Sequence, residues 1–224
     1  LAAHRKFRNF EYVLKLLEGR SQDVSISGKP ILDEEGVFQG YYGTGRNITE
    51  RKQAEKHLLE SEERFRALYH QSPSGVCLED YSRVKQRIDL LKEGGVSDFQ
   101  SYFEEHDDEL IDAVMDIILL DANDTLIKML GAETFEEYKS YEDDFESWKD
   151  TNWRKFYISE LSSMAAGGIT FTDEFQDIKV GGEILEIRCT SRIVLGREDD
   201  WSEVITTHED ITARKRAERQ LLLQ

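Results

Sequence analysis

The residues of this sequence that could do chemistry are two cysteines, five histidines and several groups of acidic side chains. Cys77 and Cys189 lie far apart without the close spacing of metal ligands, and this favours two buried thiols. His70, His106 and His208 are isolated in the sequence, which favours surface or capping roles over metal ligation. We therefore predict no metal site.

The acidic side chains do not form a catalytic or calcium-binding pattern. The cluster from Glu104 to Glu109 lacks the glycine and the alternating spacing of a calcium-binding loop, so a solvated face is the better interpretation. Asp143 and Asp144 have no base or nucleophile close by in the sequence. We predict no catalytic residue in this chain.

An aromatic stripe is the remaining candidate for binding. Trp153, Phe156 and Tyr157 share one face of an amphipathic helix expected over residues 152–167, which Gly167 and Gly168 end. Such a stripe usually packs in a core, but it could also line a small-molecule cavity.

Composition limits the partners of the chain. Its 224 residues carry a net charge of −17, and 39% of them are hydrophobic, which is enough for a core. Nucleic acids and anionic membrane surfaces both require clustered Lys and Arg, so neither is expected as a partner. No apolar run approaches the ~20 residues of a membrane span and no signal-peptide pattern is present, which predicts a cytoplasmic location.

The sequence contains an internal repeat. The segment 47–60 returns at 210–223 with a constant offset, and Asn47-Ile48-Thr49 matches Asp210-Ile211-Thr212. In both copies a polar capping residue precedes an Arg-Lys pair and a run of strong helix formers. We expect a charged helix to leave each of two similar units, the second one starting over 214–224.

The first of these helices has a short heptad-like seam. Ala54, Leu58, Ser61, Phe65 and Leu68 follow the spacing of a coiled coil, and residues 51–64 are predicted as a coiled-coil-like linker. Pairing of two such helices would make a homodimer. An ordinary surface helix packed on its own domain is the alternative.

Residues 1–50 are expected to contain three antiparallel strands. β-branched and aromatic runs alternate there with Gly and with the turn Asp33-Glu34-Glu35-Gly36. A sheet this small has an apolar face and nothing to cover it, so we expect a piece of a truncated domain.

Residues 62–213 predict a complete α+β domain. A short strand near 75–80 precedes helices over 81–115, a buried strand at 117–120, and a helix that begins after Asn123. Thr134 and Glu137 form a capping box. After the aromatic helix, a hairpin with the two-residue turn Gly181-Gly182 and a last strand at 201–207 complete the sheet.

These elements together resemble the PAS/PAC sensor domains of bacterial signalling proteins. Residues 65–68 followed by Ser72-Pro73-Ser74-Gly75 resemble the start of such domains, and Asp121-Ala122-Asn123 resembles their central helix. Residues 27–52 are very like their C-terminal third. The resemblance implies a five-stranded antiparallel sheet with helices on one face, a helical insertion at 81–115, and the end of a second PAS domain at 1–50.

The resemblance also implies a ligand between sheet and helices. The residues that hold flavin or haem in such domains are missing from the matching helices, so neither is expected, and the cofactor is left unassigned. A small metabolite is the expected ligand if one binds. The candidate pocket residues are Cys77, Asn123, Trp153, Tyr157 and Cys189.

The repeated motif is expected to couple the sheet to the outgoing helix, through Asn47 and Thr49 in the first copy and Asp210 and Thr212 in the second. The resemblance implies a non-catalytic sensory and relay region, followed in the same protein by a histidine kinase. A diguanylate cyclase or phosphodiesterase output and a ligand-free dimerisation scaffold are the alternatives. His57 lacks the neighbours of a kinase phosphoacceptor.

Overall fold

The computed structural model describes residues 5–16, 20–144, 146, 149 and 151–222. The chain divides into two units, Leu1–Ala67 and Leu68–Gln224. Parts of the predicted strand region 1–50 and of the outgoing helix 214–224 lie outside the described residues, namely 1–4, 17–19 and 223–224. Among the described helices, none is both long and apolar enough to cross a membrane.

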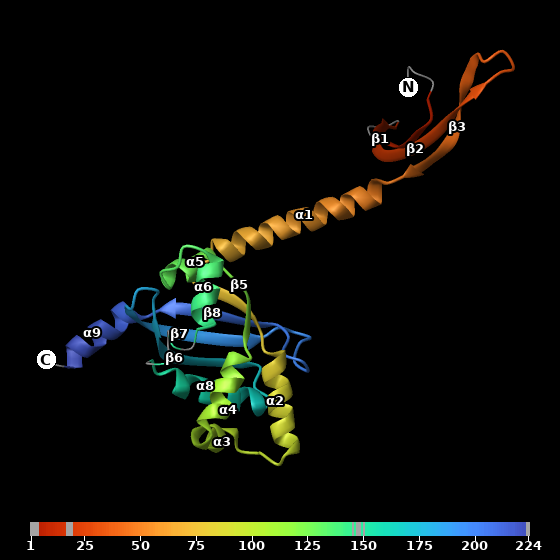
Figure 1. The fold of residues 1–224 in the computed structure, drawn as a ribbon. Helices are drawn as coiled ribbons and strands as arrows, with labels where there is room; N and C mark the ends of the chain where they lie inside the picture. Colours follow the sequence, from red (N-terminus) through yellow and green to blue (C-terminus); the bar gives the residue numbers. More distant parts are fainter. Residues whose placement is uncertain (1–4, 17–19, 145, 147–148, 150, 223–224) are drawn as a thin grey trace. The chain divides into compact units, whose positions relative to one another are not determined.

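The first unit contains a three-stranded antiparallel sheet in the order β1-β2-β3. Its strands are β1 (Phe7–Lys15), β2 (Ser21–Leu32) and β3 (Phe38–Asn47). The predicted turn between β2 and β3 forms because the Asp33 carboxylate accepts hydrogen bonds from the backbone N–H groups of Glu35 and Val37, at 3.1 and 2.8 Å. The helix α1 (Thr49–His70) follows β3, and none of its residues is buried (Figure 1).

The second unit contains the predicted five-stranded sheet. Its strands are β4 (Gly75–Asp80), β5 (Ile118–Ala122), β6 (Thr170–Ile178), β7 (Ile184–Ile193) and β8 (Val204–Asp210). They pair in the order β5-β4-β8-β7-β6, and every pair is antiparallel. The first and last strands of the unit therefore lie side by side in the centre. The α+β fold expected from the sequence is confirmed.

The helices of this unit are set by side-chain caps and apolar faces. Asp98, Asn123 and Thr134 each accept a hydrogen bond from a free backbone amide in the first turn of α3 (Phe99–Glu105), α5 (Asp124–Met129) and α6 (Phe135–Glu142). The other described helices are α2 (Ser82–Glu93), α4 (Asp107–Met115), α8 (Trp153–Ala165) and α9 (Thr212–Leu222).

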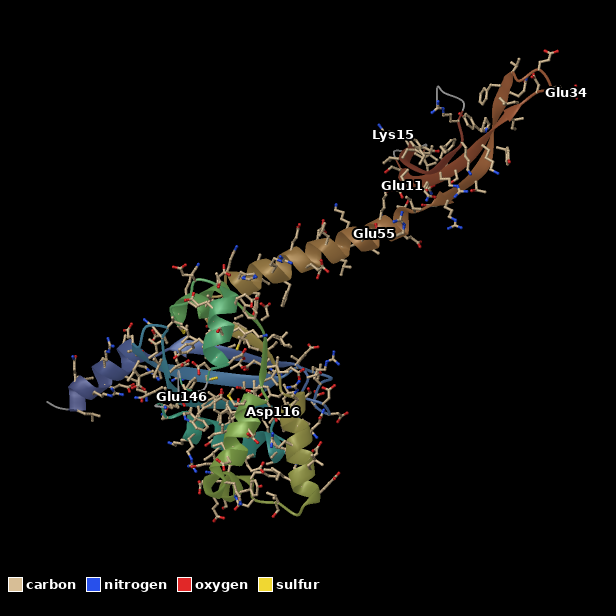
Figure 2. All side chains as sticks on the ribbon, in the orientation of Figure 1. Glu11, Lys15, Glu34, Glu55, Asp116 and Glu146 are labelled. Atoms are coloured by element: carbon tan, nitrogen blue, oxygen red, sulfur yellow. The ribbon has the colours of Figure 1, made fainter. Side chains whose placement is uncertain are left out.

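The region 81–115 forms three helices, as predicted, and they share a core with α8 (Figure 1). Val84, Ile88, Phe103 and Leu110 are fully buried there. Arg87 pairs with Asp116 at 2.8 Å and links α2 to the end of α4; Asp116 is labelled in Figure 2.

The turn between β6 and β7 differs from the prediction. Gly181-Gly182 is not a two-residue turn, because the Lys179 N–H donates to the Glu183 carbonyl at 2.8 Å and encloses a three-residue loop with Val180. Both glycines have positive φ, at 107° and 93°, which other residues rarely adopt. Val180 is also held elsewhere, since its N–H donates to the Leu130 carbonyl at 2.8 Å.

Candidate functional site

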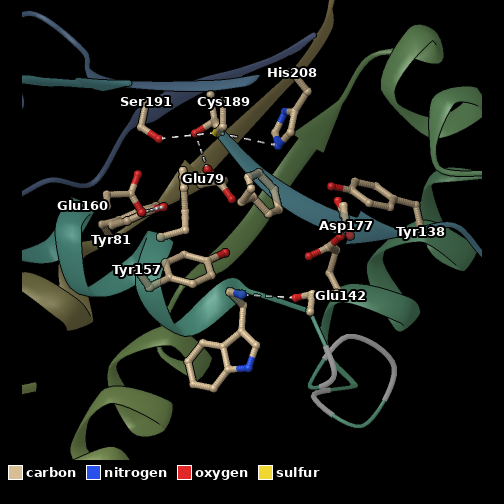
Figure 3. Close-up of a pocket in the computed structure, with 15 residues that line it drawn as sticks. Glu79, Tyr81, Tyr138, Glu142, Tyr157, Glu160, Asp177, Cys189, Ser191 and His208 are labelled. Atoms are coloured by element: carbon tan, nitrogen blue, oxygen red, sulfur yellow. Dashed lines mark hydrogen bonds between the residues drawn. The ribbon is translucent and has the colours of Figure 1, made fainter. Parts of the chain in front are cut away.

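The inner face of the five-stranded sheet and the helices α6 and α8 enclose a cavity of about 40 Å³ (Figure 3). By the usual measure of one probe sphere per water, this is room for about three water molecules. The site is therefore small, and its chemistry is set by the side chains of its wall.

Strand alternation explains how the wall is built. Side chains two residues apart point to the same face of a strand, and the central strands place polar residues at inward positions otherwise filled by apolar ones. The polar side chains of the sheet that line the cavity are Glu79 on β4, Asp177 on β6, Ser191 on β7, and Thr206 and His208 on β8.

Four carboxyl groups line the cavity, from Glu79, Glu142, Glu160 and Asp177. Glu160 and Asp177 are buried, and the other two are half-buried. Burial disfavours the charged form of a carboxyl group, and it raises the pKa of all four. Such raised pKa values mark a candidate site when they occur together in a cavity.

Glu160 is the most deeply buried of the four, with a fully covered side chain on α8. Burial raises its pKa to about 8, and the nearby Ser191 and Tyr81 hydroxyls offset part of this increase. The Tyr81 hydroxyl is 3.5 Å from Oε2. The other oxygen, Oε1, has no hydrogen-bond partner among the described residues.

The other carboxyl groups differ in their partners. Burial raises the pKa of Glu79 to about 7, although the Thr206 hydroxyl donates to its Oε2 at 2.5 Å and lowers the pKa. Burial also raises the pKa of Asp177 to about 6. Glu142 has a pKa well above its usual range because of burial and then because of the negative charge of Asp177, which lies near it in Figure 3.

His208 was expected at the surface or as a cap, and this was wrong: it is 8% exposed and lines the cavity. Burial lowers its pKa to about 4, so the ring is neutral at pH 7. Its Nε2 is 4.0 Å from the Cys189 sulfur, and its Nδ1 has no described partner. Strand alternation on β8 could have revealed the buried position.

Solved structures show a remote likeness to this chain. No protein-family model and no curated protein matches the chain. Among solved structures, the PAS domain of an HTR-like protein from Haloarcula marismortui is 14% identical, covers 71% of this chain and 99% of its own, and has a TM-score of 0.44. A domain of a sensory box sensor histidine kinase/response regulator from Geobacter sulfurreducens is 12% identical, with coverages of 68% and 96% and a TM-score of 0.41. At these identities and TM-scores the likeness carries no argument.

We call the second unit the PAS-like unit, because its strands and helices follow the order that the PAS-resembling motifs of the sequence implied. Its sheet has the five antiparallel strands that the motifs in the sequence implied, and its helices lie where those motifs placed them. The cavity of this PAS-like unit lies between the sheet and the helices (Figure 3).

The structure brings together three of the five candidate pocket residues. Trp153, Tyr157 and Cys189 line the cavity. Cys77 is buried in the adjacent core and does not line it. Both thiols are free, and burial raises their pKa well above the usual range, so they are unreactive neutral groups.

Asn123 does not line the cavity either. Its Oδ1 accepts from the N–H groups of Leu126 and Val76, at 2.9 and 3.0 Å. Its Nδ2 donates to the carbonyls of Tyr69 and Ser74, at 2.9 and 3.0 Å. The side chain therefore fastens the end of α1, the start of β4 and the start of α5 to one another.

A second candidate site is the junction between β8 and α9. The Asp210 carboxylate accepts from the Thr212 N–H at 2.8 Å, and the Thr212 hydroxyl accepts from the Glu186 N–H at 2.9 Å. The Ile211 N–H donates to the Glu186 carbonyl at 2.8 Å. The start of the helix is thus tied to β7 as well as to β8.

The first unit repeats this junction with the same atoms. The Asn47 amide oxygen accepts from the Thr49 N–H at 3.0 Å, and the Thr49 hydroxyl accepts from the Asp23 N–H at 2.9 Å. The Ile48 N–H donates to the Asp23 carbonyl at 2.8 Å. Asn47 takes the same capping role as the aspartate of the second copy.

A carboxylate on the outer face of each sheet holds the Arg-Lys pair of the helix. Glu174 pairs with Lys215 at 2.5 Å, with Arg214 at 2.6 Å and with Arg188 at 3.2 Å. Hydrogen bonds from these cations, the one from Lys215 most of all, lower the pKa of Glu174 to about 2. Glu11 occupies the equivalent position of the first unit, and it pairs with the equivalent Arg51 and Lys52 at 2.9 and 3.0 Å (Figure 2).

Metal binding finds no support in this geometry. Within the described part of the chain, no group of three or more His, Cys, Asp or Glu side chains could hold a metal ion.

The four carboxyl groups of the cavity were not predicted from the sequence, although Glu160 lies on the same helical face as Trp153 and Phe156. A charged residue at a core position was the available signal.

Proposed function

We propose that this chain is a sensory and relay region of a bacterial multidomain signalling protein, and that a histidine kinase is its output. The PAS-like unit senses through its cavity, and α9 carries the response onward. The chain itself contributes no catalysis.

The observation that supports this proposal is the repeated strand-to-helix junction. Three hydrogen bonds recur at the constant offset that separates Asn47 from Asp210, and so do the carboxylate and its Arg-Lys pair. A helix that only covers its own sheet needs one side-chain cap. Here a neighbouring strand and an outer-face carboxylate also hold the first turn, so a displacement of the sheet must move the helix.

The physical consequence is a change in helix direction or rotation. β7 carries Cys189 and Ser191 on the cavity wall and Glu186 at the junction. A ligand that shifts β7 therefore acts on α9 through the same strand. Each added helical residue rotates the downstream part of the helix by about 100°, and seven residues nearly restore the original face.

The test uses the full-length protein with one to seven residues inserted between Thr212 and Leu221. One inserted residue is expected to scramble regulation of the output, and seven are expected to restore most of it. Asp210→Ala is expected to uncouple the signal while the domain stays folded. Asp199→Ala, at an exposed position, is the matched control. A smooth decline with insertion length and no recovery near seven would show a flexible tether and refute the relay.

The same assay separates the possible outputs. A phosphorylated histidine that appears with ATP supports a kinase. Cyclic diguanylate that forms or disappears supports a cyclase or a phosphodiesterase.

We further propose that the protein is a homodimer through α1. The seam residues Leu58, Phe65 and Leu68 are 62%, 69% and 70% exposed within one chain. Burial of such side chains between two helices stabilises a pair. Leu58→Glu is expected to give a monomer in light scattering. Leu59→Glu, at the next and similarly exposed position off the seam, is expected to leave the dimer intact. A monomeric wild-type protein, or equal loss in both variants, would refute the seam.

A further inference from the structure

The cavity of the PAS-like unit is lined by four carboxyl groups, and among the described residues no lysine or arginine lines it. His208 is neutral at pH 7 because burial lowers its pKa to about 4. A buried carboxyl group is normally paired with a cation or is neutral and fully hydrogen-bonded, so a buried glutamate in this wall with an unpartnered oxygen requires an explanation.

An unpartnered buried atom points to a missing partner. Glu160 is fully buried, and its Oε1 accepts no hydrogen bond from a described residue. Buried polar atoms are nearly always hydrogen-bonded, because an unmet acceptor costs its full desolvation free energy. Glu160 lines the cavity together with Tyr81 and Tyr157, and its side chain lies beside Tyr81 in Figure 3.

Aromatic rings form much of the remaining wall. Trp153, Phe156 and Phe175 line the cavity together with three tyrosines. Phe156 and Phe175 lie 4.6 Å apart between ring centroids. The faces of aromatic rings attract cations, and such rings combined with carboxylates recognise ammonium groups. An anion would be repelled by the ionised carboxyl groups of the wall, whereas an ammonium group supplies the donor that Oε1 lacks and stabilises an ionised Glu160.

The size and the access route limit the ligand further. A volume of about 40 Å³ admits only a few non-hydrogen atoms. A second cavity shares Glu79, Tyr138, Glu142 and Tyr157 with the first. It extends to the exposed side chains of Met115 and Asp143 and is itself lined by the acidic residues Glu79, Glu142 and Asp143.

We propose that this cavity binds a small organic cation with an ammonium group, which donates hydrogen bonds to Glu160 and packs against the surrounding aromatic rings. The inference names the class of ligand for the proposed sensor and rests on that function. No metal ion is required, because the described residues form no metal-binding group.

The test is calorimetry of the chain with ethylammonium chloride, with ethanol as the neutral match and sodium chloride as the inorganic control. One ethylammonium ion is expected to bind per chain, with no measurable heat from the controls up to about 20 mM. Because Glu160 is mostly protonated at pH 7 and must ionise to hold the cation, binding is expected to release about one proton. Titrations in buffers of different ionisation enthalpy count that proton without any variant.

Two variants locate the ion. Glu160→Gln keeps the shape of the side chain and is expected to weaken binding by about tenfold or more. Glu105→Gln makes the same change at an exposed position and is expected to bind as the wild type does. Three results would each overturn the proposal. The first is that folded wild type binds no ethylammonium, and the second is that it binds ethanol or sodium equally well. The third is an unchanged affinity of Glu160→Gln for ethylammonium together with no proton release. The insertion experiment on α9 measures only the output activity, so a failure of the ligand proposal does not refute the proposed relay, which that experiment tests separately.

Discussion

Replacement of Glu160 by glutamine is expected to change how the stability of the PAS-like unit depends on pH. Burial raises the pKa of Glu160 from 4.5 to about 8, so the folded state holds a proton that the unfolded state releases above pH 4.5. Between pH 4.5 and 8 the folded state binds more protons, and the free energy of unfolding therefore falls as pH rises. This contribution of Glu160 to the free energy of unfolding is fully present below pH 4.5 and is lost as pH rises through about 8.

The magnitude follows from the difference between the two pKa values. A difference of about 3.5, at about 1.4 kcal/mol per unit, gives a loss of about 5 kcal/mol across this range. Domains of this size unfold with about 5–15 kcal/mol, so a loss of even half that amount is large. The glutamine of Glu160→Gln cannot ionise, so this variant is expected to show no such loss from position 160 in its free energy of unfolding.

The assay is urea unfolding of the wild type, Glu160→Gln and Glu105→Gln at pH values from 5 to 9. Glu79 and Asp177 also have raised pKa values and lower the stability of all three proteins as pH rises. The difference between wild type and Glu160→Gln isolates Glu160, and it is expected to grow by several kcal/mol in favour of the variant, whereas Glu105→Gln follows the wild type. Parallel curves for wild type and Glu160→Gln would show that Glu160 is ionised in the fold and would refute the reasoning.

Three further predictions concern other parts of the PAS-like unit. Burial lowers the pKa of His208 from 6.5 to about 4, so wild type is expected to lose about 3 kcal/mol of stability as pH falls through this range, and His208→Phe is expected to lack that loss in acid-unfolding curves. Phe103→Ala removes a fully buried ring between α3 and α8 and is expected to cost about 3–5 kcal/mol in urea unfolding; a cost below about 1 kcal/mol would mean that the insertion does not share the core. Thr212→Val leaves the Glu186 N–H without its acceptor and is expected to cost about 1 kcal/mol and to speed amide exchange in the first turn of α9; unchanged exchange there would contradict the junction.

The elements of the fold could be predicted from the sequence because their patterns are local. Val84 and Ile88 repeat at helical spacing, and Leu185, Ile187 and Cys189 alternate along one strand. The structure buries all five. The β6–β7 loop was mispredicted because Gly-Gly fits a two-residue turn by composition, whereas the Val180 N–H is held by the Leu130 carbonyl, a contact that composition does not reveal.

The cavity could not be assembled in the same way, because its residues meet only through the order of the strands. Glu79 and Thr206 are 127 residues apart and come together because β4 pairs with β8. Chain order alone does not give that pairing. Asn123 shows the opposite error: its resemblance to a central family position suggested a ligand contact, and its four hydrogen bonds go to the backbone instead.

The two units differ in the inner-face residues of their sheets but not in the junctions between sheet and helix. Their strands pair in the same register at the offset of the repeated motif, since Glu11 opposite Ser25 matches Glu174 opposite Arg188, and Val24 opposite Asn47 matches Ile187 opposite Asp210. The positions of Asp177, Cys189, Ser191, Thr206 and His208 are occupied in the first unit by Leu14, Ile26, Gly28, Gly43 and Gly45.

The inner face of the first sheet thus carries none of these polar groups, while its junction with the helix keeps the same hydrogen bonds and the same carboxylate with its Arg-Lys pair. In the second unit the inner-face residues line the cavity, whereas the outer-face carboxylate and the junction residues hold the helix to the sheet. The junction residues and the outer-face carboxylate recur in both units, whereas the polar inner-face residues occur only in the second unit. Glu174 and Glu11 lie on the opposite face of their strands from the inner positions, so substitutions at the inner positions can alter the cavity without altering these ion pairs with the helix.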